Sequence, residues 1–172
     1  PWTDAEDPIS MIQQTPDGRF YDVMAGEDER GGGALLFFGL RKPLPIAAAQ
    51  RELHSSMKVL EPASSLSPRP WIEIEKPFWL DVPIWLASEE IDSIGICHNH
   101  LWREGGLPNE AWGRARDSGR WPGPQGNGRY TQEIYYHALN CGFRIPPSAG
   151  SASGVLPNPV GYNRCYVQVG ER

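Results

Sequence analysis

Two histidines that flank an asparagine are the residues of this chain with the best spacing for chemistry. His98, Asn99 and His100 directly follow a short apolar segment at 91–97. Successive side chains of an extended chain point to opposite faces, so His98 and His100 point the same way and can share one ligand or one metal ion. Strand ends are also where α/β proteins place their functional residues. The alternative is structural, with one imidazole capping the strand by hydrogen bonds and the other in solvent.

A carboxylate would complete a metal site around these imidazoles. A catalytic zinc ion takes three protein ligands and keeps one position open for water. We predict Glu75, in the alternating segment 71–76, as the third ligand of a divalent Zn, Mn or Fe ion. In the alternative, Glu73 and Glu75 face solvent as partners of Lys76.

Apolar and alternating segments predict the elements that position these residues. Strands are expected at 34–40, 71–76, 91–97 and 163–169, and helices at 45–53, 78–90 and 132–141, the last with Thr131 as its N-cap. Residues 1–33 are expected to be an irregular N-terminal segment, and residues 101–129 a long loop rich in glycine, proline and tryptophan. The alternation of strands and helices predicts one α/β domain over residues 1–172 with mostly parallel strands.

Composition excludes several classes of partner. The chain has 172 residues, of which 40% are hydrophobic and 22% are charged, as in an ordinary globular domain with one core. Its net charge of −5 argues against nucleic acid as a partner, because phosphates require clustered Lys and Arg. No apolar run reaches the ~20 residues of a membrane-spanning helix, so no membrane partner is expected. The first residue is Pro1 and not Met, so we expect a segment upstream, which leaves a targeting signal and the localisation undecided.

The cysteines do not form a recognisable framework. The three cysteines are Cys97, Cys141 and Cys165. Their odd number and wide spacing fit neither a set of disulfides nor a zinc site. All three have apolar neighbours in the sequence, and we predict buried free thiols.

Four segments in the second half of the chain resemble a known family. They are residues 91–96, 138–142, 143–151 and 161–167, which together are similar to the later half of the polymerase and histidinol phosphatase (PHP) superfamily, in its carbaryl-hydrolase-like (CehA/McbA) branch. The resemblance implies a distorted (β/α) barrel with divalent metals at the C-terminal strand ends. It also implies hydrolysis of esters or phosphoesters by a metal-bound hydroxide.

The chain departs from the family pattern at its metal ligands. Gly95 stands where the family carries a metal-facing Glu, and Ala152 and Gly154 stand where it uses Asp and His. No His-X-His pair precedes residue 91, so we expect an incomplete barrel. An incomplete barrel exposes strand edges, and we therefore expect a homo-oligomer or pairing with a missing N-terminal part of the same barrel.

Two functions of different classes follow. The first is a metal-dependent hydrolase in which His98 and His100 are catalytic and, with Glu75, bind the metal. The second is a catalytically inactive, metal-free barrel that binds a polar or carbohydrate-like small molecule. Its expected ligand-binding residues are Asn99, Ser151, Ser153 and Arg164, although Arg164 has the alternative of an ion pair with Asp92.

Overall fold

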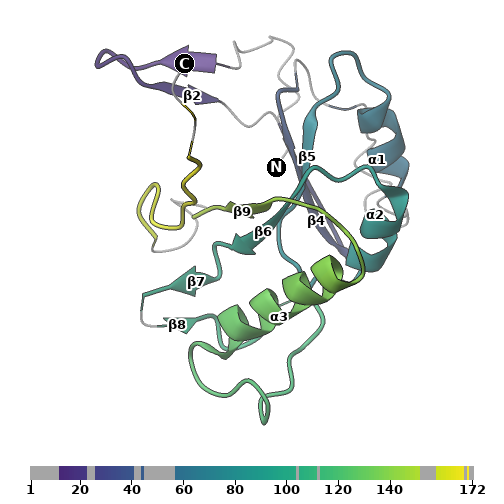
Figure 1. The fold of residues 1–172 in the computed structure, drawn as a ribbon, viewed down its shortest axis with the longest axis vertical. Coiled ribbons are helices and arrows are strands. Elements are labelled where there is room, and N and C mark those ends of the chain that lie inside the picture. Colours follow the sequence, from purple (N-terminus) through teal and green to yellow (C-terminus); the bar gives the residue numbers. More distant parts are fainter. Residues whose placement is uncertain are drawn as a thin grey trace. The chain divides into compact units, whose positions relative to one another are not determined.

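The computed structural model describes residues 12–22, 26–40, 44, 57–103, 105–111, 113–151, 158–168 and 170 (Figure 1). They divide into two compact units. The first consists of the described residues up to Glu75 together with Trp79–Ser93, and the second of Lys76–Phe78 together with the described residues from Ile94 onward.

The first unit is built on antiparallel strands. A short hairpin pairs β1 (Ile12–Gln14) with β2 (Phe20–Asp22). The central strand β4 (Gly33–Phe38) pairs on one side with β3 (Gly26–Arg30) and on the other with β5 (Trp71–Ile74). Two residues, Gly31 and Gly32, turn the chain from β3 into β4, a connection so short that the strands must run antiparallel. At Gly33 the φ angle is +135° and a Cβ would lie 2.5 Å from the Trp79 side chain, so only glycine fits this position.

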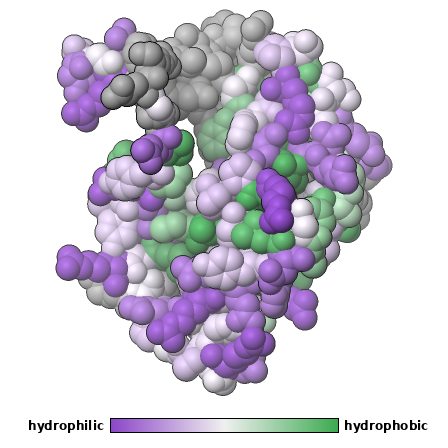
Figure 2. All heavy atoms as spheres, in the orientation of Figure 1, coloured by the Kyte–Doolittle hydropathy of each residue, from purple (hydrophilic) through white to green (hydrophobic). Residues whose placement is uncertain are grey.

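The core of the first unit forms between this sheet and two helices. The helices are α1 (Met57–Ser64) and α2 (Val82–Ser88). Leu35 and Phe37 of β4 and Trp85 of α2 are completely buried. Burial of side chains of this size is the main stabilising contribution to the unit. On the face shown in Figure 2, hydrophobic residues are visible only in patches between hydrophilic ones.

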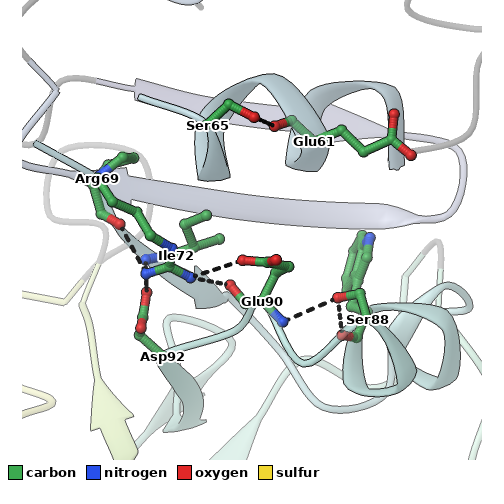
Figure 3. A network of polar contacts seen from close by, with 9 residues as sticks. Glu61, Ser65, Arg69, Ile72, Ser88, Glu90 and Asp92 are labelled. Carbon is green, nitrogen blue, oxygen red and sulfur yellow. Dashed lines mark hydrogen bonds and ion pairs between the residues drawn. The ribbon is translucent and has the colours of Figure 1, made fainter. Parts of the chain in front are cut away.

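A polar network fixes the connection that follows α2 (Figure 3). One Arg69 nitrogen lies 2.6 Å from Asp92 Oδ2 and another donates to the Glu90 carbonyl at 2.6 Å. The same Asp92 oxygen accepts the Ile72 N–H at 2.7 Å. The ion-pair partner of Asp92 is therefore Arg69, in place of the predicted alternative Arg164.

The second unit contains a long helix and two short strand pairs. β6 (Ser93–Cys97) pairs with β9 (Pro147–Ala149) in parallel, and β7 (Leu101–Trp102) pairs with β8 (Gly105–Gly106) in antiparallel orientation. The helix α3 covers Gly126–Asn140. A Cβ on Gly126 would lie 2.1 Å from the Trp121 carbonyl oxygen, so the close approach of the preceding loop requires glycine at the start of α3.

The predicted α/β barrel with mostly parallel strands is wrong. The fold is α+β with mostly antiparallel strands, and the described strands form open arrangements and no closed barrel. The continuous apolar sequence of β4 suggested a strand in a parallel sheet, but a strand covered on both faces has the same composition in an antiparallel sheet. The short Gly31–Gly32 turn decides the direction.

Several predicted elements are confirmed, and others are corrected. The strands at 34–40, 71–76 and 91–97 and the helix at 78–90 correspond to β4, β5, β6 and α2. The segment 1–33, expected to be irregular, contains β1, β2 and β3, and the segment 101–129, expected to be a loop, contains β7 and β8. The strand expected at 163–169 is not formed by the described residues of that range. The expected helix at 45–53 lies outside the described residues, and no described helix is long and apolar enough to span a membrane.

Candidate functional site

The two histidines lie side by side in a buried turn at the end of β6. The Leu101 N–H donates to the His98 carbonyl at 3.0 Å, which closes the turn. The ring centroids of His98 and His100 are 5.7 Å apart, and both side chains are buried, with 2% and 6% of their surface exposed. Phe78 packs against both rings, at 5.3 Å from His98 and 6.0 Å from His100. The rings therefore share one side of the turn, and both are shielded from solvent.

His98 uses both of its ring nitrogens within the protein. Nδ1 accepts the backbone N–H of His100 at 3.3 Å, and Nε2 lies 3.0 Å from Thr131 Oγ1. A neutral imidazole that accepts at Nδ1 carries its proton on Nε2, so Nε2–H donates to the Thr131 hydroxyl. His98 thus orients the turn and has no nitrogen left for a ligand.

Burial keeps both imidazoles uncharged. It lowers the pKa of His98 well below the usual value, and the positive charge of the buried Lys76 and the neighbouring His100 lower it further. Burial and, second, Lys76 lower the pKa of His100 to about 4. At neutral pH the pair is therefore uncharged, whereas an efficient general acid or base has a pKa near the working pH.

Thr131 is positioned by α3, which begins earlier than the sequence predicts. The sequence pattern suggested Thr131 as an N-cap, but α3 begins at Gly126 and Thr131 lies completely buried inside the helix. Asn127, one turn before it, is also completely buried. Asn127 and Thr131 lie four positions apart and therefore on the same side of a helix. This spacing was the signal in the sequence that could have suggested a polar contact such as that of Thr131 with His98.

Replacing Thr131 with valine tests this contact. We expect Thr131→Val to lower the free energy of unfolding by about 1–3 kcal/mol, because the shape is kept while His98 Nε2–H loses its acceptor. Urea unfolding measures the loss, and ring ¹H–¹⁵N spectra report the His98 Nε2–H proton. Thr131→Ser is the control and should keep that proton protected. An unprotected ring proton in the wild-type chain would contradict the contact.

Two asparagines that sequence reasoning missed hold the turn from outside. Asn163 Nδ2 donates to the His98 carbonyl at 2.8 Å and lies within 3.3 Å of the Gly150 carbonyl. Asn158 Nδ2 donates to the Asn99 carbonyl at 3.1 Å. Both asparagines are buried and both lie about 60 positions from the turn, so no local pattern could reveal their role.

The predicted ligand-binding residues have different surroundings. Ser151 is buried, and its hydroxyl accepts the Asn163 N–H at 2.8 Å. Asn163 therefore joins Ser151 to the histidine turn. Arg164 is exposed and its guanidinium lies 5.8 Å from the Tyr166 ring centre. Ser153 lies outside the described residues.

Two polar atoms of the histidine turn stand out because they are buried without a partner. Asn99 Oδ1 and His100 Nδ1 have no hydrogen-bond partner among the described residues. A buried polar atom in this condition costs free energy unless a ligand or a water molecule satisfies it. These two atoms are the hydrogen-bonding capacity of the turn that the described residues leave unused.

The described residues do not fit the predicted metal ion. Glu75 follows β5 in the first unit, where its N–H donates to the Ala34 carbonyl at 3.2 Å. Within the described residues, no group of three His, Cys, Asp or Glu side chains has an arrangement that could hold a metal. His98 has both nitrogens in use. The predicted Zn, Mn or Fe site remains a prediction that lacks a donor set in this part of the chain.

A buried ion pair fixes the loop that leads into α3. The side chains of Glu110 and Arg116 form this pair with only 2% and 9% of their surfaces exposed. The Arg116 N–H and Asn127 Nδ2 also donate to the Glu110 carboxylate, both at 3.0 Å. The pair thereby fastens the start of α3, the helix that carries Thr131 to His98.

Fold and site together define an α+β protein with a buried pair of neutral histidines in its second unit. Comparison with protein-family models, with curated proteins and with solved structures found no match to this chain. The resemblance to the PHP superfamily therefore remains a prediction.

Proposed function

We propose that this chain is a non-catalytic binding domain whose second unit binds a neutral, carbohydrate-like ligand at the His98–Asn99–His100 turn. The observation that carries the proposal is the pair of buried atoms without a partner, Asn99 Oδ1 and His100 Nδ1. They belong to adjacent residues of one turn, and the proposed ligand presents hydroxyl groups to both.

The chemistry of the two atoms favours a polyol. A carboxamide oxygen only accepts hydrogen bonds, and the free nitrogen of a neutral imidazole accepts or donates according to its tautomer. A hydroxyl group both donates and accepts, and a sugar presents several of them on adjacent carbons. A carboxylate has no proton to offer Asn99 Oδ1, so a ligand with hydroxyl groups matches better.

Two observations support binding without chemistry. The low pKa of both histidines leaves neither as a proton carrier near neutral pH. The nitrogens of His98 are already occupied by Thr131 and by the His100 N–H. A hydrolase acting through this turn would have to break those contacts first.

A titration with sugars tests the proposal. Glucose, mannose, galactose and sucrose are added to ¹⁵N-labelled protein, and the ring nitrogens of His100 and the carboxamide of Asn99 are followed by NMR. We expect saturable shifts at these atoms with at least one sugar, because a new hydrogen bond changes their shielding. Asn99→Ala should weaken that binding about tenfold, the equivalent of one hydrogen bond of about 1.4 kcal/mol.

The control and the contrary outcomes are distinct. Asn140→Ala, at the exposed end of α3, should leave sugar binding unchanged. Shifts that are absent up to high millimolar sugar would overturn the proposal. Stoichiometric zinc or manganese that supports ester hydrolysis, both lost in His98→Ala and His100→Ala, would favour the metal-dependent hydrolase instead.

A further inference from the structure

Two of the three cysteines lie in segments that run together in the second unit. Cys97 ends β6 and is partly exposed, and Cys165 is exposed in the segment 158–168. Both are free thiols. The prediction that the cysteines are buried is therefore wrong for Cys165, and also for Cys141, which is exposed after α3.

Hydrogen bonds show how the two segments meet. The Gly150 N–H donates to the Cys97 carbonyl at 3.0 Å, and Ser151 Oγ accepts the Asn163 N–H at 2.8 Å. Asn163 also reaches across to the His98 carbonyl, at 2.8 Å. His98, which directly follows Cys97, is thus hydrogen-bonded to Asn163, which lies two positions before Cys165.

The two thiols differ in their surroundings. Cys97 is partly buried, and burial raises its pKa, with a further contribution from Cys165. This contribution agrees with the path of the backbone that the hydrogen bonds define.

We propose that Cys97 and Cys165 form a redox modification site, at which a hydroperoxide oxidises the two thiols to a disulfide that ties the segment 158–168 to the end of β6. The exposed Cys165 thiolate attacks one oxygen of the peroxide, which gives a sulfenic acid and releases hydroxide. The Cys97 sulfur then attacks the sulfenic sulfur and releases a second hydroxide. With the two thiol protons, the net reaction converts two thiols and one H₂O₂ into one disulfide and two molecules of water.

The disulfide has a structural consequence beside the histidine turn. It would hold in place the segment from which Asn163 binds the His98 carbonyl. It would also close a long loop of the chain and so restrict the unfolded state, which is the usual way in which disulfides stabilise proteins.

Peroxide titration with mapping of the thiols tests the proposal. The reduced chain is treated with a small molar excess of H₂O₂, free thiols are counted with Ellman's reagent, and non-reduced peptides are identified by mass spectrometry. We expect the count to fall from three to one, with Cys141 remaining and one peptide linking Cys97 to Cys165. The midpoint of thermal unfolding should rise by roughly 5–10 °C.

Single substitutions supply the controls. Cys141→Ser should keep the linked peptide, whereas Cys97→Ser and Cys165→Ser should both lose it together with the rise in the unfolding midpoint. A linked peptide that contains Cys141, dimers linked between chains, or oxidation of the thiols to acids without a disulfide would each overturn the proposal.

Discussion

Acidification from pH 7 to pH 4 is expected to lower the free energy of unfolding by about 2–3 kcal/mol through His100 alone. In the unfolded chain a histidine binds its proton near pH 6.5, but in the folded protein the pKa of His100 is about 4. Between these values the unfolded state binds more protons than the folded state, so stability falls as the pH falls. Each unit of difference in pKa corresponds to about 1.36 kcal/mol, reduced here because solvent reaches part of the ring.

His98 should add to this loss in the same direction. Its pKa is lowered further by burial, by Lys76 and by His100. Protonation of its Nδ1 would also remove the acceptor of the His100 N–H. The contribution of both histidines is fully present above about pH 6.5 and is lost progressively below it.

Urea unfolding at intervals between pH 7 and pH 4 measures the effect. His98→Gln and His100→Gln should each reduce the slope of stability against pH, because each removes one group whose pKa differs between the two states. Asn140→Ala at the exposed end of α3 is the control, since it removes no titratable group, and it should leave the slope unchanged. If the double variant of His98 and His100 loses stability with falling pH as steeply as the wild type, the prediction is wrong.

Replacing Glu110 with alanine is expected to lower the free energy of unfolding by about 3–5 kcal/mol. The substitution leaves the Arg116 guanidinium without its carboxylate, although only 9% of that side chain is exposed. It also removes the acceptor of the Arg116 N–H and of Asn127 Nδ2. A buried charge without a partner is far more costly than the ion pair itself is stabilising.

An exposed ion pair in the same unit provides the control. Arg120 pairs with Glu133, and 61% of the Arg120 side chain is exposed, so Arg120→Ala should cost at most about 1 kcal/mol. Replacing both members of the buried pair, as Glu110→Leu with Arg116→Met, should recover much of the loss. Chemical unfolding of the four proteins separates these outcomes, and a loss below 1 kcal/mol for Glu110→Ala would show that the pair is not buried in solution.

The candidate site could be predicted from sequence only as far as local geometry reaches. His98 and His100 were expected to share one side, and their rings lie 5.7 Å apart, although they stand in a turn after β6 and not on the extended strand from which the expectation was drawn. The prediction could not include Thr131, Asn158 or Asn163, because their contacts join residues that are 33 to 65 positions apart. Nor could it include the burial of the turn, which depends on Phe78 packing over both rings.

The sequence by itself determined the positions of β4, β5, β6 and α2, because apolar period and turn residues act over a few neighbouring positions. It did not determine the direction in which strands pair, since a buried strand has the same composition in a parallel and in an antiparallel sheet. The tertiary structure alone decided that the two histidines are buried and neutral, because a pKa depends on the solvent and charges that surround a side chain, and those are brought together only by folding.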